Sequence, residues 1–176
     1  EEILEPVNKM DGDSLPVSKF VPHVDGTFHL GASAYEKRGV AVSVPAWNAQ
    51  TCIQCNQCAY VCPHATIRPF ALTQAEADAA PAGAQIVDIK AGKGKGVYKY
   101  TLSVSPLDCM GCSVCVSICP TKSLTMVPLE QEAPRQPVFD YMVSKVAPKA
   151  DMESVATVKD SQFKQPLLQF SGSCAG

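Results

Sequence analysis

The chain has 176 residues, of which 46% are hydrophobic, and its 15 Lys and Arg are nearly balanced by 17 Asp and Glu. A formal net charge of -2, with basic residues scattered singly, gives no positive patch for nucleic acid. No apolar stretch approaches the roughly 20 residues of a membrane helix, and the acidic start lacks the zones of a signal peptide. We therefore expect a cytoplasmic protein with neither a membrane nor a nucleic-acid partner, and the absent initiator Met indicates a piece of a longer polypeptide.

The first predicted unit is a strand, a cysteine loop, a short helix and a second strand. Valines alternate over 40–44, as in a weak strand. Three cysteines, each separated from the next by two residues, then predict a loop. A short helix is predicted over 58–62 and stops at Pro63. The chain leaves this helix as a predicted strand over 67–72.

An insertion over 73–96 follows the first unit. Thr73 and Glu76 have the spacing of a capping box, which predicts a short Ala-rich helix. A hairpin is predicted beyond this helix, with its tip at 92–96. We expect the helix and the hairpin to form a polar surface lid over one side of the domain.

The second unit repeats the order of the first. Alternation over 98–104 predicts the strand that enters it, a short helix spans 115–119 before Pro120, and a strand follows over 124–129. Apolar residues at helical spacing then predict an amphipathic helix that docks on another domain. These residues are Val138, Phe139, Met142, Val143 and Val146.

A shift of 57 residues lays the first unit on the second. Every cysteine of one run then falls on a cysteine of the other, and the match continues beyond the sulfurs. The further matching pairs are Pro63 and Pro120, Ile67 and Leu124, Phe70 and Val127, and Leu72 and Leu129. Such a match is typical of a duplicated supersecondary unit, and it predicts an α+β core with metal between pseudo-twofold halves.

The spacing of the cysteines predicts iron–sulfur clusters. Thiolate is the ligand that iron in a sulfide-bridged cube requires, and the fourth cysteine of a C-x2-C-x2-C-x3-C-P run binds the cluster of the other run. Because each cluster then ties the halves together, cluster binding is expected to be coupled to folding. The first 4Fe-4S cluster is assigned Cys52, Cys55, Cys58 and Cys119, and the second is assigned Cys62, Cys109, Cys112 and Cys115.

Other interpretations of these residues fit less well. The odd count of nine cysteines and the triplet that occurs twice argue against a disulfide framework, and a structural zinc site uses two separated pairs. The glycines over 92–96 lack the spacing of a phosphate loop. No partner pattern surrounds His23, His29 or His64, so no catalytic residue is predicted. Trp47 is expected to shield the first cluster, and the small Gly111 and Ser113 to leave backbone N–H groups free to bond sulfur.

The flanks of the cysteine runs resemble the ferredoxin-like domain of the pyruvate:ferredoxin oxidoreductase family. The similarity lies in the stretch 52–65, in the Glu-Lys-Arg-Gly segment at 36–39 and in the segment 11–18. The stretches 165–168 and 170–176 resemble the run that opens the thiamine diphosphate domain of the family. The resemblance covers essentially the whole chain, and the insertion is its least diagnostic part.

This resemblance implies an electron-relay segment of an enzyme that decarboxylates pyruvate oxidatively to acetyl-CoA. The family uses thiamine diphosphate, Mg²⁺ and coenzyme A, and three 4Fe-4S clusters that deliver electrons to an external ferredoxin or flavodoxin. By the same resemblance Cys174 is one ligand of the third cluster, and the parent enzyme is a homodimer.

The resulting fold prediction is α+β, with a duplicated bacterial two-cluster ferredoxin-like core and long extended N- and C-terminal arms. Its parts are an N-terminal linker arm over 1–39, the two-cluster domain over 40–129 and a C-terminal linker over 130–176 that leads into a thiamine diphosphate domain. Two other hypotheses stay open. One is a stand-alone two-cluster ferredoxin carrier, which needs neither arm, and the other is a structural module that holds zinc or disulfides.

Overall fold

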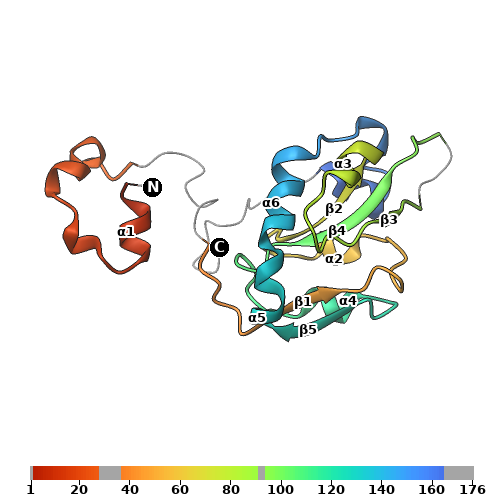
Figure 1. Cartoon of the computed structure of the whole chain (residues 1–176), viewed down its shortest axis with the longest axis horizontal. Helices are drawn as coiled ribbons and strands as arrows, with labels where there is room; N and C mark the ends of the chain where they lie inside the picture. The colour runs from red at the N-terminus through yellow and green to blue at the C-terminus, as the bar shows by residue number, and fades with distance from the viewer. Residues whose placement is uncertain (1, 28–36, 91–93, 165–176) are drawn as a thin grey trace. The chain divides into compact units, whose positions relative to one another are not determined.

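The computed structural model describes residues 2–27, 37–90 and 94–164, and it divides the chain into two compact units between Lys37 and Arg38 (Figure 1). The first unit holds the helix α1 (Leu4–Asn8) and two 3-10 helices, Gly12–Ser14 and Val17–His23. The predicted extended N-terminal arm is therefore wrong over these residues. Local backbone hydrogen bonds, such as Lys19 N to Pro16 O at 2.9 Å, coil the chain instead.

The second unit mixes short helices with short strands, which confirms the predicted mixture of helix and strand. None of the helices within the described ranges has the length and apolar character to cross a bilayer. In chain order its elements are β1 (Ser43–Trp47), α2 (Gln57–Tyr60), β2 (Ile67–Leu72), α3 (Gln74–Asp78), β3 (Val87–Asp88), β4 (Lys99–Val104), α4 (Val114–Ile118), β5 (Leu124–Pro128), α5 (Leu129–Glu132), α6 (Gln136–Lys145) and α7 (Val158–Ser161). Three 3-10 helices accompany them, Ala133–Arg135, Ala150–Met152 and Gln162–Lys164.

Two antiparallel sheets exchange strands between the repeats (Figure 1). The strand β1 precedes the first cysteine run and pairs with β5, which follows the second run. The strand β4 precedes the second run and pairs with β2, which follows the first, and β3 extends this sheet in the order β2-β4-β3. The registers keep the 57-residue shift, because the pair Trp47–Leu124 corresponds to the pair Val104–Ile67. Neither half can therefore complete its sheet alone.

The predicted strands agree with the structure except for the first. The 67–72 prediction matches β2, and those over 98–104 and 124–129 differ from β4 and β5 by one residue at one end. The strand predicted over 40–44 is present, but its bounds are wrong, because β1 begins three residues later at Ser43 while Val40 and Val42 are exposed. Pro45 interrupts the alternation along β1, although a two-stranded ladder tolerates proline. Shifting the predicted strand 98–104 back by 57 residues gives 41–47, which is close to β1. The repeat therefore indicated the position of this strand, whereas the alternating valines indicated an earlier one.

The inserted segment forms the predicted helix and hairpin. Thr73 caps α3 through a complete capping box, in which its hydroxyl accepts from Glu76 N at 3.2 Å and Glu76 accepts from Thr73 N at 2.7 Å. Val87 and Asp88 pair with β4, and residues 91–93 of the predicted tip lie outside the described residues.

The amphipathic helix α6 packs inside this unit, so the prediction that it docks on another domain is wrong. Val138, Met142 and Val146 are buried in one cluster with Phe70 and Leu72 of β2. Phe139 meets Phe70 in a T-shaped contact with ring centroids 6.5 Å apart. The predicted extended C-terminal arm is also wrong over 130–164, since this stretch contains α6, α7 and several shorter helical turns, and the apolar face of α6 covers the core. Helical periodicity shows that a face is buried but not what covers it.

Glu76 ties α3 to the segment after α6. Its carboxylate also accepts from Ala147 N at 3.1 Å and from Lys149 Nζ at 3.0 Å. Burial raises the pKa of Glu76, but these bonds and those from Thr73 outweigh it and leave the pKa below its ordinary value. The stability that depends on this carboxylate is therefore present above the unfolded-state pKa and is lost as the pH falls through the folded-state pKa.

We expect Glu76→Gln to lower the free energy of unfolding by about 1 kcal/mol near neutral pH, because a cap and a screened ion pair are lost. In acid below the folded-state pKa, wild type and variant should be equally stable. Denaturant unfolding at both pH values measures this difference. Asp78→Asn, on the exposed side of the same helix, is the control and should change little. A cost in Glu76→Gln that is the same at both pH values would contradict the linkage.

Candidate metal centres

Each cysteine run forms a tight loop that turns into a short helix. The loops turn through positive φ angles at positions that the 57-residue shift relates. The pairs are Gln54 (59°) with Gly111 (70°), Asn56 (58°) with Ser113 (63°), and Ala65 (53°) with Lys122 (52°). The repeat is thus present in the backbone conformation as well as in the positions of the sulfurs.

Two cavities bring together cysteines of both runs. The first is lined by Cys52, Cys55, Cys58 and Cys119. The second is lined by Cys62, Cys109, Cys112 and Cys115. Each cavity therefore holds three cysteines of one run and the last cysteine of the other, which is the grouping that the sequence predicts for the ligands. Ligation of iron by these sulfurs stays a prediction.

The cysteines in the described part of the chain are free thiols. Among the described residues, no three His, Cys, Asp or Glu side chains converge as a single ion requires. A four-iron cube takes one thiolate for each iron, so its ligands surround a volume instead of a point. Four sulfurs around a cavity fit such a cube in this respect.

Burial opposes the ionisation of the inner cysteines. It raises the pKa of Cys58 and Cys109, and it raises the pKa of Cys115 to about 12. Burial also acts on Cys119, but hydrogen bonds from Ser123 and Thr121 outweigh it and lower the pKa of this thiol. Buried thiolates need a positive partner, and iron would supply one while it displaces the protons.

Backbone N–H groups reach sulfur at matching places in the two loops. Gln54 N donates to Cys52 Sγ at 3.3 Å, and Gly111 N donates to Cys109 Sγ at 3.4 Å. The second bond confirms the prediction for Gly111. Ser113 instead provides the left-handed turn before α4, and its hydroxyl donates to Gly111 O at 3.5 Å. Bonds of this kind tune the potential of a cluster.

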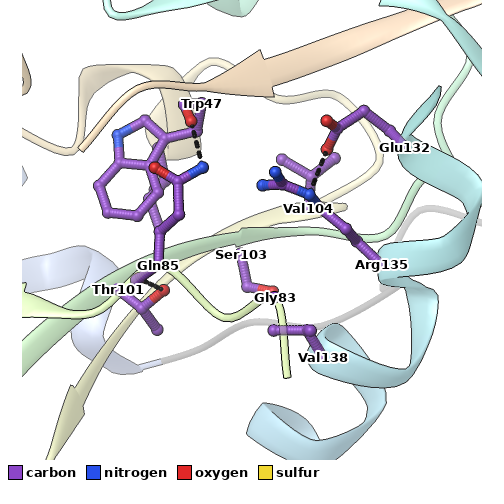
Figure 2. Close-up of a pocket in the computed structure, with 10 residues that line it drawn as sticks. Trp47, Gly83, Gln85, Thr101, Ser103, Val104, Glu132, Arg135 and Val138 are labelled. Atoms are coloured by element: carbon purple, nitrogen blue, oxygen red, sulfur yellow. Dashed lines mark hydrogen bonds and ion pairs between the residues drawn. The ribbon is translucent and has the colours of Figure 1, made fainter. Parts of the chain in front are cut away.

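Trp47 separates the first cysteine cavity from a neighbouring pocket. The indole lines both, is only 6% exposed and meets Tyr100 edge to face at 6.0 Å. Figure 2 shows this pocket, in which Gln85 and the Glu132–Arg135 pair face one another while the indole nitrogen of Trp47 points away. Trp47 Nε1 is buried and has no hydrogen-bond partner among the described residues. A donor left unpaired beside the cysteine cavity fits a site that is to hold inorganic sulfide.

The insertion and the C-terminal segment hold the first cysteine loop. Gln54 Nε2 donates to Asp88 O at 2.8 Å, and Gln54 Oε1 accepts from Lys90 N at 2.7 Å. Asn56 Nδ2 donates to Lys159 O at 2.8 Å. The insertion is therefore hydrogen-bonded to the loop. Sequence analysis did not identify Gln54 and Asn56 as anchors of this loop.

The second cavity reaches the surface at Cys112. This cysteine is exposed, and Met110, which also lines the cavity, is 37% exposed. His64 also lines this cavity, whereas His23 lies in the first unit and bonds Thr27 O through Nδ1 at 2.7 Å. His29 and Cys174 lie outside the described residues.

Two family models match the sequence. Residues 51–123 match the 4Fe-4S dicluster domain, and residues 1–41 match a domain of unknown function named EKR. The dicluster match contains both cysteine runs, and with them every cysteine that lines the two cavities, and it supports iron–sulfur clusters as the cofactor.

Curated relatives match the chain over nearly its full length. The pyruvate-flavodoxin oxidoreductase of Klebsiella pneumoniae is 50% identical over 177 residues, which are 99% of this chain and 15% of that protein. The pyruvate:ferredoxin oxidoreductase of Moorella thermoacetica is 47% identical over 179 residues, 100% of this chain and 15% of that protein. The mitochondrial pyruvate dehydrogenase [NADP(+)] of Euglena gracilis is 42% identical over 179 residues, 100% of this chain and 10% of that protein. These homologues are enzymes, and the chain spans about 15% of the length of the first two.

Proposed function

We propose that this chain, whose full-length homologues are named pyruvate-flavodoxin or pyruvate:ferredoxin oxidoreductase, is the electron-relay segment of such an enzyme. The observation that carries the proposal is the grouping of eight cysteines in two cavities, each with three sulfurs from one run and one from the other. Cys52, Cys55, Cys58 and Cys119 would hold the first 4Fe-4S cluster. Cys62, Cys109, Cys112 and Cys115 would hold the second.

A 4Fe-4S cluster, when bound, takes up and releases one electron at a time. The residues of this chain fix the conditions of that exchange. The crossed sheets hold both cysteine groups in one unit, Trp47 and Tyr100 exclude water from the first cavity, and N–H groups of Gln54 and Gly111 bond sulfur. The exposed surface at Cys112 supports electron exit from the second cavity.

Other parts of the proposal rest on the relatives and on the family resemblance. Pyruvate would be decarboxylated to acetyl-CoA elsewhere in a homodimeric parent, with thiamine diphosphate, Mg²⁺ and coenzyme A, and Cys174 would serve a third cluster there. Ferredoxin or flavodoxin would accept the electrons, as the names of the relatives from Klebsiella pneumoniae and Moorella thermoacetica indicate for those proteins. A stand-alone carrier is disfavoured, because the homology extends beyond residues 51–123 at both ends.

Iron and acid-labile sulfide analysis of anaerobically prepared protein tests the two clusters directly. We expect about eight irons and about eight sulfides per chain, because each of two cubes contributes four of each. EPR of the dithionite-reduced protein should show two interacting reduced clusters. Zinc in place of iron, or about four irons in protein that has been fully reconstituted, would overturn the proposal.

A further inference from the structure

Arg68 of β2 is the bulkiest fully buried side chain among the described residues, with 2% of its surface exposed. Its Nη1 donates to Gln162 Oε1 at 2.9 Å and its Nη2 donates to Ala59 O at 2.6 Å, while Nε has no partner among the described residues. Among these residues, no carboxylate forms an ion pair with the guanidinium. Burial of a cation without an anion is energetically costly. A guanidinium that stays charged inside the core therefore requires a negatively charged partner.

The surroundings of Arg68 place that partner among the sulfurs. The carbonyl that accepts from Nη2 belongs to Ala59, the residue after Cys58 of the first group. Thr66, two residues before Arg68 in the chain, lies with its Oγ1 3.5 Å from Cys62 Sγ of the second group. Burial lowers the pKa of Arg68 and the thiolates of Cys62 and Cys58 oppose that lowering, so the guanidinium, which stays protonated in proteins, is attracted to both groups.

We propose that Arg68 is the buried counter-ion shared by the two clusters and that its charge raises the reduction potential of both. The inference rests on the proposed function, since it requires both clusters to be bound. Four thiolates make each cluster anionic, and reduction adds a further negative charge beside the guanidinium. A nearby cation stabilises the reduced state more than the oxidised state, and low solvent exposure preserves this effect. Arg68 thus acts on the reduction potentials through its charge.

Reduction potentials of the full, cluster-loaded chain test this role by EPR-monitored titration. In Arg68→Met we expect the one-electron equilibrium of each cluster to move about tenfold toward the oxidised form, a shift of about 59 mV to lower potential. Arg68→Lys keeps the charge and should keep both potentials near wild type. Lys99→Met, which removes a cation on the neighbouring strand that is 34% exposed and already paired with Asp88, should shift neither.

Two changes at Gln162 separate charge from hydrogen bonding. Gln162→Glu supplies a carboxylate that still accepts from Nη1, so it should lower both potentials as Arg68→Met does while it keeps the fold. Gln162→Leu removes the hydrogen bond but leaves the charge, so it should leave both potentials unchanged.

The outcomes distinguish this proposal from the one beneath it. Wild-type protein with about eight irons, but with unchanged potentials in Gln162→Glu, overturns the counter-ion alone, even where Arg68→Met fails to load clusters. Equal shifts in Arg68→Lys and Arg68→Met would also overturn it, because they would show a packing role only. Wild-type protein without two clusters would instead refute the proposed function.

Discussion

Cys58→Ala is expected to lower the iron content from about eight to about four or fewer per chain, because the first cube loses one of its four thiolates. Cys58 is buried in α2 and lines the first cavity, so no water or neighbouring side chain can easily replace it. The second cluster should be weakened as well, since each cluster ties together the same two halves. In the proposed parent enzyme, electron delivery to the external acceptor should fail while the chemistry on thiamine diphosphate continues.

The same measurement on other cysteines tests the crossed grouping. Cys119→Ala should lose the first cluster and keep the EPR signal of the second, as Cys58→Ala does, although residue 119 belongs to the second run. Cys62→Ala should lose the second cluster and keep the signal of the first. Ser117→Ala, an exposed change on α4 whose hydroxyl bonds only Ser113 O in the described structure, is the control and should retain all the iron. Unchanged iron in Cys58→Ala, or a signal in Cys119→Ala that matches Cys62→Ala, would refute the ligand assignment.

Gly111→Ala is expected to destabilise the unit and to reduce loading of the second cluster. Gly111 has a φ of 70°, and a Cβ there would lie 2.9 Å from Ser43 O and 3.3 Å from Ala41 Cβ. The left-handed conformation alone costs an alanine roughly 1–2 kcal/mol. The contact adds to this cost, because Ser43 O is a backbone atom of β1 and can retreat only if the β1–β5 ladder shifts. The loop that carries Cys109 and Cys112 would then be displaced from the second cavity.

Gly83→Ala separates these two causes. Gly83 has a φ of 92° in the same unit, but nothing lies within 4 Å of the position of a Cβ. The Gly83→Ala variant should lose roughly 1–2 kcal/mol of unfolding free energy because of the backbone strain. It should keep its iron. Unfolding free energy and iron content are measured for both variants. Equal iron loss in both, or full iron in Gly111→Ala, would show that the contact with β1 does not shape the second site.

Local patterns in the sequence predicted much of this protein. The capping box of Thr73 and Glu76 and the strand over 67–72 were found from short-range signals, which depend on neighbours in the chain. The cysteine spacing also predicted which cysteines line each cavity. Three cysteines with two residues between neighbours can share one loop, whereas the fourth cysteine of the run joins the other group. The helix over 136–145 was predicted as amphipathic, but its partner was misjudged.

The sequence by itself determined the duplicated unit, its short helices and strands, and the two groups of sulfur donors, since each depends on residue type and spacing along a local stretch. Only the tertiary structure decided that β1 pairs with β5 and β4 with β2, that α6 covers β2, and that the buried Arg68 bonds the backbone carbonyl of Ala59, next to Cys58. Those features join residues far apart in the chain. Their energies come from burial and from contacts that exist only after the two halves have met, and periodicity along the chain carries no record of which surfaces will meet.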